Sequence, residues 1–212
     1  MKSDPRSFVE ALGSERFDRL RRFERLLREV ALPRGFIAES DRGRIWERHV
    51  LDSIRSVACL PERPVAIVDI GSGAGLPGIP VAISRPDCAV TLLEPKRSRA
   101  AFLELVVESL PVPNARVEAA RAEELSLGSD IALARALADP RAAWKLAEPL
   151  LQPPGALVYF AGASWCEQDT GSMTGLGVRC EICVGASFRW EGPLVKMGRA
   201  PTTGAEEPEN ER

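Results

Sequence analysis

Long apolar runs are absent from this 212-residue sequence, and no stretch approaches the roughly 20 apolar residues that a membrane-spanning helix needs. The first ten residues, MKSDPRSFVE, lack the basic-then-apolar order of a secretory signal. Collagen-like, fibrous and wholly disordered chains are also excluded, because 45% hydrophobic and 27% charged residues are ordinary globular values. We therefore expect a soluble cytoplasmic protein that makes no contact with a membrane.

Cysteine and histidine are both scarce, with five cysteines and one histidine in the chain. The cysteines follow no repeating spacing, and we expect them to be reduced thiols. Cys180 and Cys183 resemble half of a zinc site, but the sequence offers no second pair, and residues three apart in a strand point to opposite faces. We therefore expect no metal ion in the functional site.

A large excess of one charge is also missing, since the formal net charge is -2. A strongly basic balance, the usual footprint of a nucleic-acid partner, is therefore not evident from the total. The distribution is uneven, however. Residues 201–212 contribute a net charge of -3, which leaves +1 for residues 1–200, and residues 1–55 carry +3. This excess near the N-terminus permits an RNA partner without demanding one.

Helical periodicity dominates the N-terminal part of the chain. Apolar residues recur at spacings of three and four over residues 7–30 and predict an amphipathic helix that ends at the Pro-Arg-Gly break, residues 33–35. Residues 45–60 predict a second helix, which Pro61 ends. Arginines alternate with acidic residues in the first helix, which favours an ion-paired, solvated face over a phosphate-binding one.

From residue 65 onward, short apolar runs alternate with helical periods, as in a parallel sheet with crossover helices. The pattern predicts a doubly wound, Rossmann-like α/β sheet with strands at 65–70, 89–94, 115–119, 131–134 and 156–160. Helices are expected at 78–84, 96–110 and 140–151. Residues 161–177 show only a faint helical pattern, and the runs 178–186 and 188–197 predict an antiparallel edge hairpin.

These patterns divide the chain into three expected parts. Residues 1–62 form an N-terminal helical cap, and residues 63–200 form the α/β domain that binds the ligand. Residues 201–212, rich in glutamate, are expected to be a disordered acidic tail.

The most informative stretch is VDIGSGAGLPG, residues 68–78. A strand that ends in glycines lets a ligand approach the backbone, and the helix that follows presents unpaired N–H groups. The dinucleotide fingerprint would use Gly71 and Gly73 and require a small residue at position 76, where this chain has Leu76. Its third glycine comes earlier, at Gly75. The G-x-G-x-G form after an acidic strand end is typical of an S-adenosylmethionine loop, with a nicotinamide or flavin site and a structural turn as alternatives.

Glu94 gives a second indication, because it ends the next expected strand, 23 positions after Gly71. A carboxylate at that place can accept hydrogen bonds from both hydroxyls of a ribose. Together the loop and Glu94 predict that a nucleoside-containing cofactor binds here.

The string GSGAGLPGIPVAI, residues 71–83, resembles the ribosomal small-subunit methyltransferase G family, also called glucose-inhibited division protein B. Further blocks occur in family order: RHVLDS at 48–53, TLLEPKR at 91–97, RAEE at 121–124 and ARALA at 134–138. The blocks lie within residues 8–162, about three quarters of the chain. Several ordered blocks are far more specific than any one of them.

The resemblance implies a class I S-adenosylmethionine-dependent methyltransferase that methylates N7 of a guanine in the decoding-region loop of 16S rRNA. The implied partner is 16S rRNA or the small ribosomal subunit, and we expect the enzyme to be a monomer. Carried over residue by residue, Gly71 and Leu76 line the cofactor loop. Ala122 and Glu123 flank the adenine, and Arg135 lies at the methionine or substrate end.

Guanine N7 has a lone pair and no proton, so its attack on the methyl group requires no general base. Holding the reactants in line can itself lower a barrier by about 7–11 kcal/mol. Accordingly we assign no catalytic residue, and keep Arg135 and His49 as candidates. Arg48 and His49 are also the candidate substrate-binding residues, with a packed histidine and an ordinary surface Arg135 as the alternatives.

Two further groups of side chains have open interpretations. Asp52 is spaced to pair with Arg48 at i,i+4 along one helix. Trp46, Trp144 and Tyr159 could stack on a splayed base, although packing in the core is the expectation for each.

The chain departs from the family pattern at three places. Residues 35–40 read GFIAES where the family has Asn-Leu-Thr, the family's Lys-Gly is Ala161-Gly162, and a glycine-punctuated run at 163–177 stands where a helix is expected. These departures leave open a methyltransferase for another RNA or a small molecule. They also leave open a ribosome-associated protein that binds the cofactor without transferring methyl.

Overall fold

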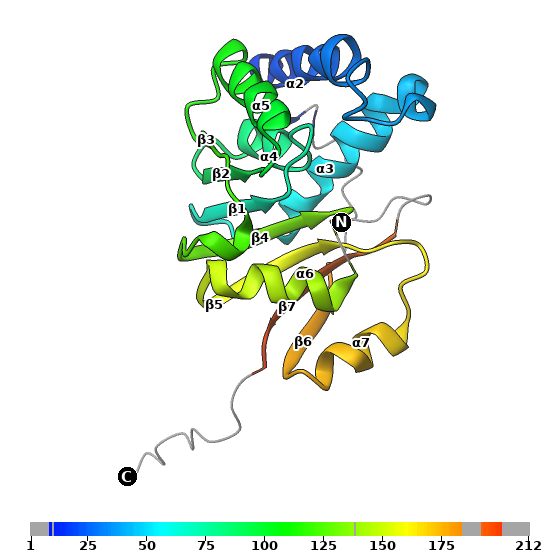
Figure 1. The fold of residues 1–212 in the computed structure, drawn as a ribbon, viewed down its shortest axis with the longest axis vertical. Helices are drawn as coiled ribbons and strands as arrows, with labels where there is room; N and C mark the ends of the chain where they lie inside the picture. The colour runs from blue at the N-terminus through cyan, green and yellow to red at the C-terminus, as the bar shows by residue number, and fades with distance from the viewer. Residues whose placement is uncertain (1–8, 10, 138, 184–191, 201–212) are drawn as a thin grey trace.

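The fold is known from a computed structural model that describes residues 9, 11–137, 139–183 and 192–200. A seven-stranded sheet with strand order β3-β2-β1-β4-β5-β7-β6 runs through the molecule (Figure 1). The strands are β1 (Ala66–Ile70), β2 (Ala89–Leu93), β3 (Ala115–Glu118), β4 (Ser129–Arg135), β5 (Leu151–Phe160), β6 (Val178–Ile182) and β7 (Leu194–Arg199). Strands β1 to β5 pair in parallel, whereas β7 is antiparallel to both β5 and β6. The α/β expectation is confirmed.

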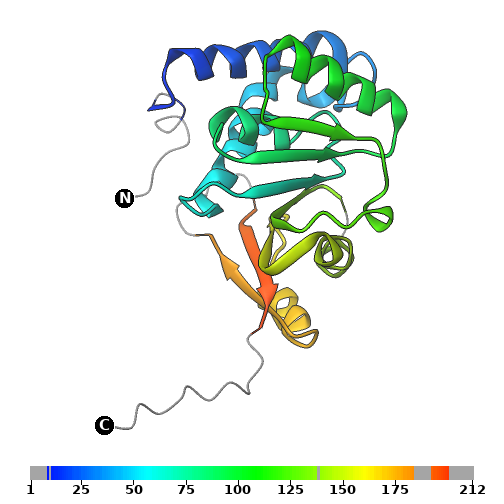
Figure 2. The same cartoon turned by 90° about the vertical axis from the view of Figure 1, so that its left-hand side faces the viewer.

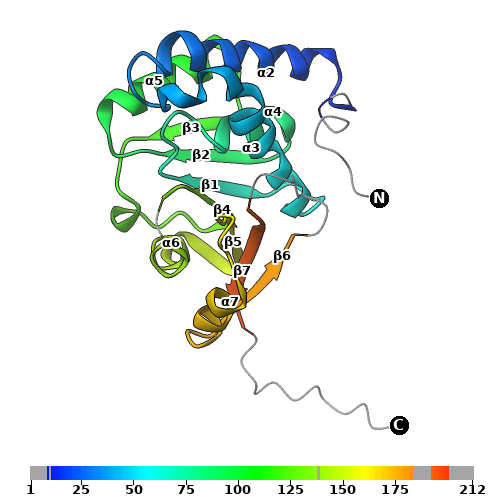
Figure 3. The same cartoon turned by 90° about the vertical axis from the view of Figure 1, so that its right-hand side faces the viewer.

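Helices cover both faces of the sheet (Figures 1 and 3). The first face carries α2 (Ser14–Leu26), η1 (Leu27–Ala31), η2 (Glu39–Arg44), η3 (Trp46–Leu51), α3 (Asp52–Ile54), η4 (Arg55–Cys59), α4 (Gly78–Ser84) and α5 (Arg97–Ser109). The second face carries η5 (Ala122–Glu124), α6 (Pro140–Ala147), η6 (Glu148–Leu150) and α7 (Glu167–Thr174). Among the described residues, no helix is long and apolar enough to cross a membrane.

Strand alternation explains why the core has two halves. In β1, Ile67 packs with the cluster that contains the N-terminal helices, whereas Val68 and Ile70 pack with the cluster around α6 and α7. Phe23 of α2 is fully buried in the first cluster, so the N-terminal helices complete the core on that face. In Figure 2, α2 and α5 lie side by side across the top, and Arg22 donates a hydrogen bond to the Ser109 carbonyl (2.7 Å).

The first predicted helix is interrupted near its start. Val9 and Ala11 are helical, but Gly13 has a φ of +83°, which a right-handed helix cannot continue, so α2 starts at Ser14. The residues before Val9 lie outside the described part of the chain. The second helical segment starts earlier than predicted, at Glu39, and ends at Cys59 as a chain of short helical pieces.

The glycine-punctuated run after β5 contains a helix, so its assignment as a departure from the family's helix is corrected. Helix α7 forms because Asp169 accepts a hydrogen bond from the Cys166 backbone N–H (2.9 Å), which caps its first turn. The antiparallel hairpin is present, with β7 inserted between β5 and β6. Of the two hairpin strands, only β6 therefore lies at an edge of the sheet. Residues 184–191 of that hairpin and the tail 201–212 lie outside the described residues.

Candidate functional site

A pocket of about 570 Å³ opens at the carboxyl ends of β1, β4 and β5, where α/β sheets bind ligands. Its walls come from three parts of the chain: the helical segment 36–55, the glycine loop 71–76 and the strand ends 135–136 and 159–162, with one residue of α5. A hollow of about 740 Å³ between α6 and the β6–β7 hairpin is larger. No glycine loop and no carboxyl end of a parallel strand lines that hollow.

Backbone geometry accounts for two glycines of the loop region. Gly71 has a φ of +71°, and a Cβ there would lie 2.8 Å from a methyl group of Leu137. The Gly78 N–H donates to Asp69 Oδ2 (2.9 Å), and a Cβ on Gly78 would lie 2.6 Å from that same oxygen. Glycine at these positions lets the loop turn sharply and lets α4 pack directly on β1.

Glu94 is hydrogen-bonded to the backbone of the glycine loop. Its side chain accepts hydrogen bonds from the backbone N–H groups of Gly73 (3.0 Å) and Lys96 (2.8 Å), and the residue is 3% exposed. It does not line the pocket itself. Glu94 therefore ties the glycine loop to the start of α5, and its predicted contact with a ribose stays a prediction.

Asp69 lies just before the glycine loop without lining the pocket, and the sequence used it only as the acidic strand end of the loop motif. It is fully buried in β1, and its Oδ1 has no hydrogen-bond partner within the described part of the chain. Burial raises the pKa of this carboxyl group to about 7. The signal for it is an acidic residue inside an apolar strand, two positions before the first loop glycine.

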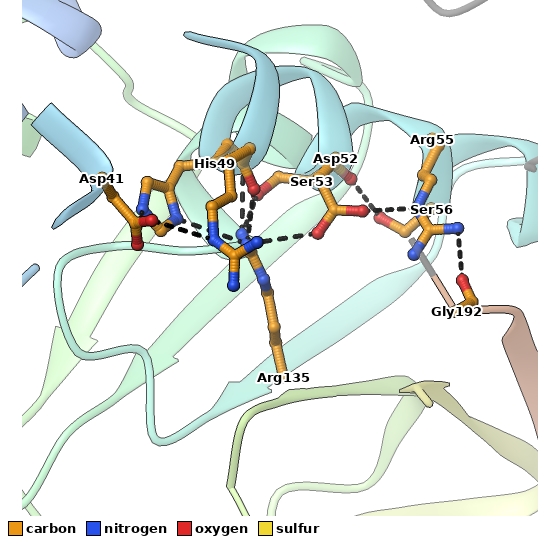
Figure 4. A network of polar contacts seen from close by, with 9 residues as sticks. Asp41, His49, Asp52, Ser53, Arg55, Ser56, Arg135 and Gly192 are labelled. Carbon is orange, nitrogen blue, oxygen red and sulfur yellow. Dashed lines mark hydrogen bonds and ion pairs between the residues drawn. The ribbon is translucent and has the colours of Figure 1, made fainter. Parts of the chain in front are cut away.

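Arg135 ends β4 and points into the helical segment that carries Arg48 and His49 (Figure 4). Its guanidinium donates to the backbone carbonyls of Arg48 (2.6 Å) and His49 (3.3 Å). It also lies 3.2 Å from Asp52 Oδ2. Arg135 thus links the N-terminal helices to the sheet by hydrogen bonds and an ion pair, and it also lines the pocket. Its predicted contact with the cofactor or substrate stays a prediction.

His49 lies between Asp41 and Arg135. Its Nδ1 is 3.3 Å from an Arg135 nitrogen, and because a guanidinium can only donate, Nδ1 accepts and the proton sits on Nε2. Nε2–H then donates to Asp41 Oδ2 (3.1 Å). Burial, followed by the charge of Arg135, lowers the pKa of His49 to about 4. The histidine is therefore neutral at physiological pH, with both nitrogens engaged.

Asp52 does not pair with Arg48, which corrects the i,i+4 expectation. Its carboxylate lies 2.6 Å from Arg55 Nε and 3.2 Å from Arg135, and the residue is 2% exposed. Arg48 instead pairs with Asp41 (3.1 Å). The helix turns Asp52 toward the sheet and leaves Arg48 half exposed, so the two side chains point to different environments.

Arg55 continues this network toward the C-terminal strands. It donates a hydrogen bond to the Gly192 carbonyl (2.8 Å), just before β7 (Figure 4). The guanidinium groups of Arg55 and Arg135 lie 5.7 Å and 5.8 Å from the centre of the Phe160 ring. One carboxylate and one aromatic ring therefore hold both arginines between the helical segment and the ends of β4 and β5.

The remaining predicted residues are divided between the pocket and its surroundings. Gly71, Leu76, Arg48, His49 and Arg135 all line the pocket, whereas Ala122 and Glu123 form part of η5 after β3 and do not. Trp144 is 5% exposed, as expected for a core residue, and Trp46 packs against Phe17. Tyr159 is buried but also lines the pocket.

The pocket also contains residues that the sequence did not single out, among them Phe36 and Arg99. Phe36 lies in the GFIAES stretch, which departs from the family pattern, so the departure itself was the available signal. No group of three or more metal-ligating side chains that could hold an ion occurs among the residues described by the structure.

Comparison with known proteins adds independent information. The sequence model of the family described as rRNA small subunit methyltransferase G matches residues 16–172. A protein of that name from Thermobifida fusca is 39% identical over 160 residues, covering 74% of this chain and 67% of its own length. One from Rhodococcus jostii is 37% identical over 184 residues, covering 82% and 79%.

Solved structures with a similar fold are methyltransferases of low sequence identity. A ribosomal protein L11 methylase from Lactobacillus delbrueckii subsp. bulgaricus superposes with a TM-score of 0.56 at 11% identity, over 72% of this chain and 79% of its own. Fibrillarin from Aeropyrum pernix, in complex with natively bound S-adenosyl-L-methionine, gives 0.50 at 15% identity, over 65% and 68%. From the family match, the relatives and the fold together, this chain belongs to the rRNA small subunit methyltransferase G family and has the class I methyltransferase fold.

Proposed function

We propose that the chain binds S-adenosylmethionine in the 570 Å³ pocket and transfers its methyl group to N7 of a guanine in 16S rRNA. The observation that carries this proposal is the convergence of the glycine loop and the Arg48–His49–Arg135 cluster, both typical of the family, on one pocket. Family membership favours this reading over a small-molecule methyltransferase or a non-catalytic cofactor-binding protein.

The residues present suit this cofactor. Gly71 and Gly73 line the pocket with positive φ values. Because glycine has no side chain, a ligand can approach the loop backbone closely at these positions. In this arrangement Gly71 and Leu76 line the cofactor, Glu94 approaches the ribose, and Ala122 and Glu123 flank the adenine.

Bound S-adenosylmethionine supplies an electrophilic methyl group on a positively charged sulfur. Guanine N7 can attack it directly, because its lone pair is free. A neutral His49 with both nitrogens engaged is not needed as a base and serves to orient Arg135. The contribution of the chain is alignment of N7, methyl carbon and sulfur, which is worth about 7–11 kcal/mol in favourable cases.

Family membership indicates a ribosomal RNA substrate, and the details of this substrate are part of the proposal. We propose that the partner is the 16S rRNA within the small ribosomal subunit, that the target base lies in the decoding-region loop, and that the enzyme acts as a monomer. A ribosomal substrate of this kind is found in the cytoplasm.

The test uses small subunits that lack the modification, incubated with the protein and methyl-labelled S-adenosylmethionine. Label is expected in 16S rRNA at one guanine, which borohydride and aniline then cleave, because N7 methylation makes the base labile. Label in another acceptor, or no transfer by protein that binds the cofactor in calorimetry, contradicts the proposal. Gly71→Val is the matched loss-of-binding control, since its Cβ meets Leu137.

A further inference from the structure

Four arginines line the pocket, and three of them pair with carboxylates, of which Asp52 is shared by two. These pairs are Arg48 with Asp41 (3.1 Å), Arg55 with Asp52 (2.6 Å) and Arg135 with Asp52 (3.2 Å). The fourth is Arg99, which contacts no carboxylate among the described residues. Arg99 therefore supplies an uncompensated positive charge to the pocket wall.

Arg99 is held in place by an aromatic ring. Its guanidinium carbon lies 5.6 Å from the centre of the Phe36 ring, and Phe36 packs edge-on against Phe102 of α5 (5.8 Å between centroids). A cation–π contact of this kind restrains a guanidinium and occupies only one of its faces. The N–H donors along its edge thus stay available to a ligand.

A fixed guanidinium with available donors suits a phosphate group, because its fork matches two phosphate oxygens. The proposed substrate carries a phosphate on either side of every nucleotide. A guanine that is splayed out of an RNA loop into a pocket brings those phosphates to the pocket wall. The other three arginines already contact carboxylates, which compete with a phosphate for their N–H donors.

We propose that Arg99, positioned by Phe36, binds a backbone phosphate of the rRNA next to the target guanine. The inference rests on the proposed function and adds a substrate contact to it. Since Phe36 replaces the family's own pattern at residues 35–40, this chain holds the arginine with its own aromatic ring.

The experiment measures binding of undermodified small subunits to protein saturated with S-adenosylhomocysteine, at several salt concentrations. Arg99→Ala is expected to weaken binding about tenfold near 0.1 M salt and to reduce the slope of log K against log salt by about 0.7–1, the value for one lost phosphate contact. Arg99→Lys keeps the charge, and its binding constant is expected to lie between those of the wild type and Arg99→Ala. Phe36→Leu is expected to weaken binding a few-fold.

Arg97→Ala is the matched control, because it removes the same charge from the same turn of α5 at a residue that does not line the pocket. A slope that Arg99→Ala leaves unchanged, or an equal effect of Arg97→Ala, overturns the inference. So does weaker cofactor binding with unchanged RNA binding, because Arg99 then holds the carboxylate of the cofactor. Failure of the proposed function is separate: the wild-type protein then transfers no methyl to the subunits.

Discussion

At the scale of single residues, two buried ionisable groups, His49 in the pocket wall and Asp69 in β1, have pKa values shifted in the directions that burial favours. Burial and Arg135 keep His49 neutral, and burial keeps a proton on Asp69 well above the usual range of a carboxyl group. Their contributions to the pH dependence of stability have opposite signs. Each contribution can therefore be measured only as a difference between wild type and a variant.

His49 is expected to make the fold less stable in acid. Its pKa is about 4 in the folded protein and 6.5 when unperturbed, so between these values the unfolded chain binds more protons and stability falls as pH falls. From pH 7.5 to pH 5 the loss is about 2 kcal/mol. Urea unfolding at the two pH values should show this loss in wild type and not in His49→Gln, and equal pH profiles of the two proteins would contradict the neutral histidine.

Asp69 is expected to act in the opposite direction. Its folded pKa of about 7 lies above the unperturbed 3.8, so the folded protein binds more protons between them and stability falls as pH rises. Wild type should lose about 2–3 kcal/mol between pH 5 and pH 8 that Asp69→Asn does not lose. The asparagine can still accept the Gly78 N–H. Thermal or urea unfolding of the cofactor-free proteins measures the difference, and a parallel pH course for both contradicts it.

At the scale of elements, the decisive contact joins the helical segment η3–α3–η4 to the end of β4. Arg135 binds two carbonyls of η3 and the carboxylate of Asp52, and Asp52 in turn binds Arg55. Ion pairs as buried as this cost several kcal/mol when one partner is removed, because the other charge stays buried. The shape of the pocket therefore depends on the same arginine that the sequence suggests as a ligand contact.

Arg135→Ala is accordingly expected to destabilise the protein by about 3 kcal/mol as well as to lower methyl transfer. Urea unfolding and turnover with labelled donor measure the two effects. Arg63→Ala is the control, since Arg63 pairs with Asp130 at the surface (3.0 Å, 64% of its side chain exposed) and should cost less than about 1 kcal/mol. If Arg135→Ala keeps wild-type stability and only binds the cofactor more weakly, Arg135 contacts the ligand without stabilising the fold, which contradicts the prediction.

Gly78 sets the distance between α4 and the sheet. A methyl group there would lie 2.3 Å from Leu92 and 2.6 Å from Asp69 Oδ2, so Gly78→Ala should destabilise the protein by about 1–3 kcal/mol. Gly43→Ala, where the added methyl meets nothing within 4 Å, should be neutral or slightly stabilising. Thermal unfolding compares the two. Equal effects of both substitutions would contradict the close packing of α4 on β1.

At the scale of the whole molecule, the parallel α/β sheet, its antiparallel hairpin and the place of the pocket could be predicted from the sequence. Apolar runs of strand length separated by helical periods permit few topologies, because parallel strands need right-handed crossovers. The loop 71–78 marked the ligand end of β1, and the parallel register then brings Glu94 and Arg135 to the same edge. The start of α2 was less predictable, because the positive φ of a single residue, Gly13, decides it.

The partners of the charged side chains could not be predicted in this way. Spacing along one helix paired Arg48 with Asp52, but the sheet lies on one side of that helix and attracts Asp52 to Arg135, which is 83 positions away in the chain. Phe36 and Arg99 meet for the same reason, since α5 and the helical segment come together only in the folded chain. Local periodicity carries no information about such contacts.

By itself the sequence determined the α/β class, the cofactor loop and the family, because these follow from period, glycine placement and ordered motifs within the chain. Tertiary structure alone decided which carboxylate meets which arginine, that His49 is neutral, and that Arg99 contacts an aromatic ring and, among the described residues, no acidic side chain. The physical reason is that burial and charge pairing depend on distance in space. Residues far apart in the chain set both quantities around this pocket.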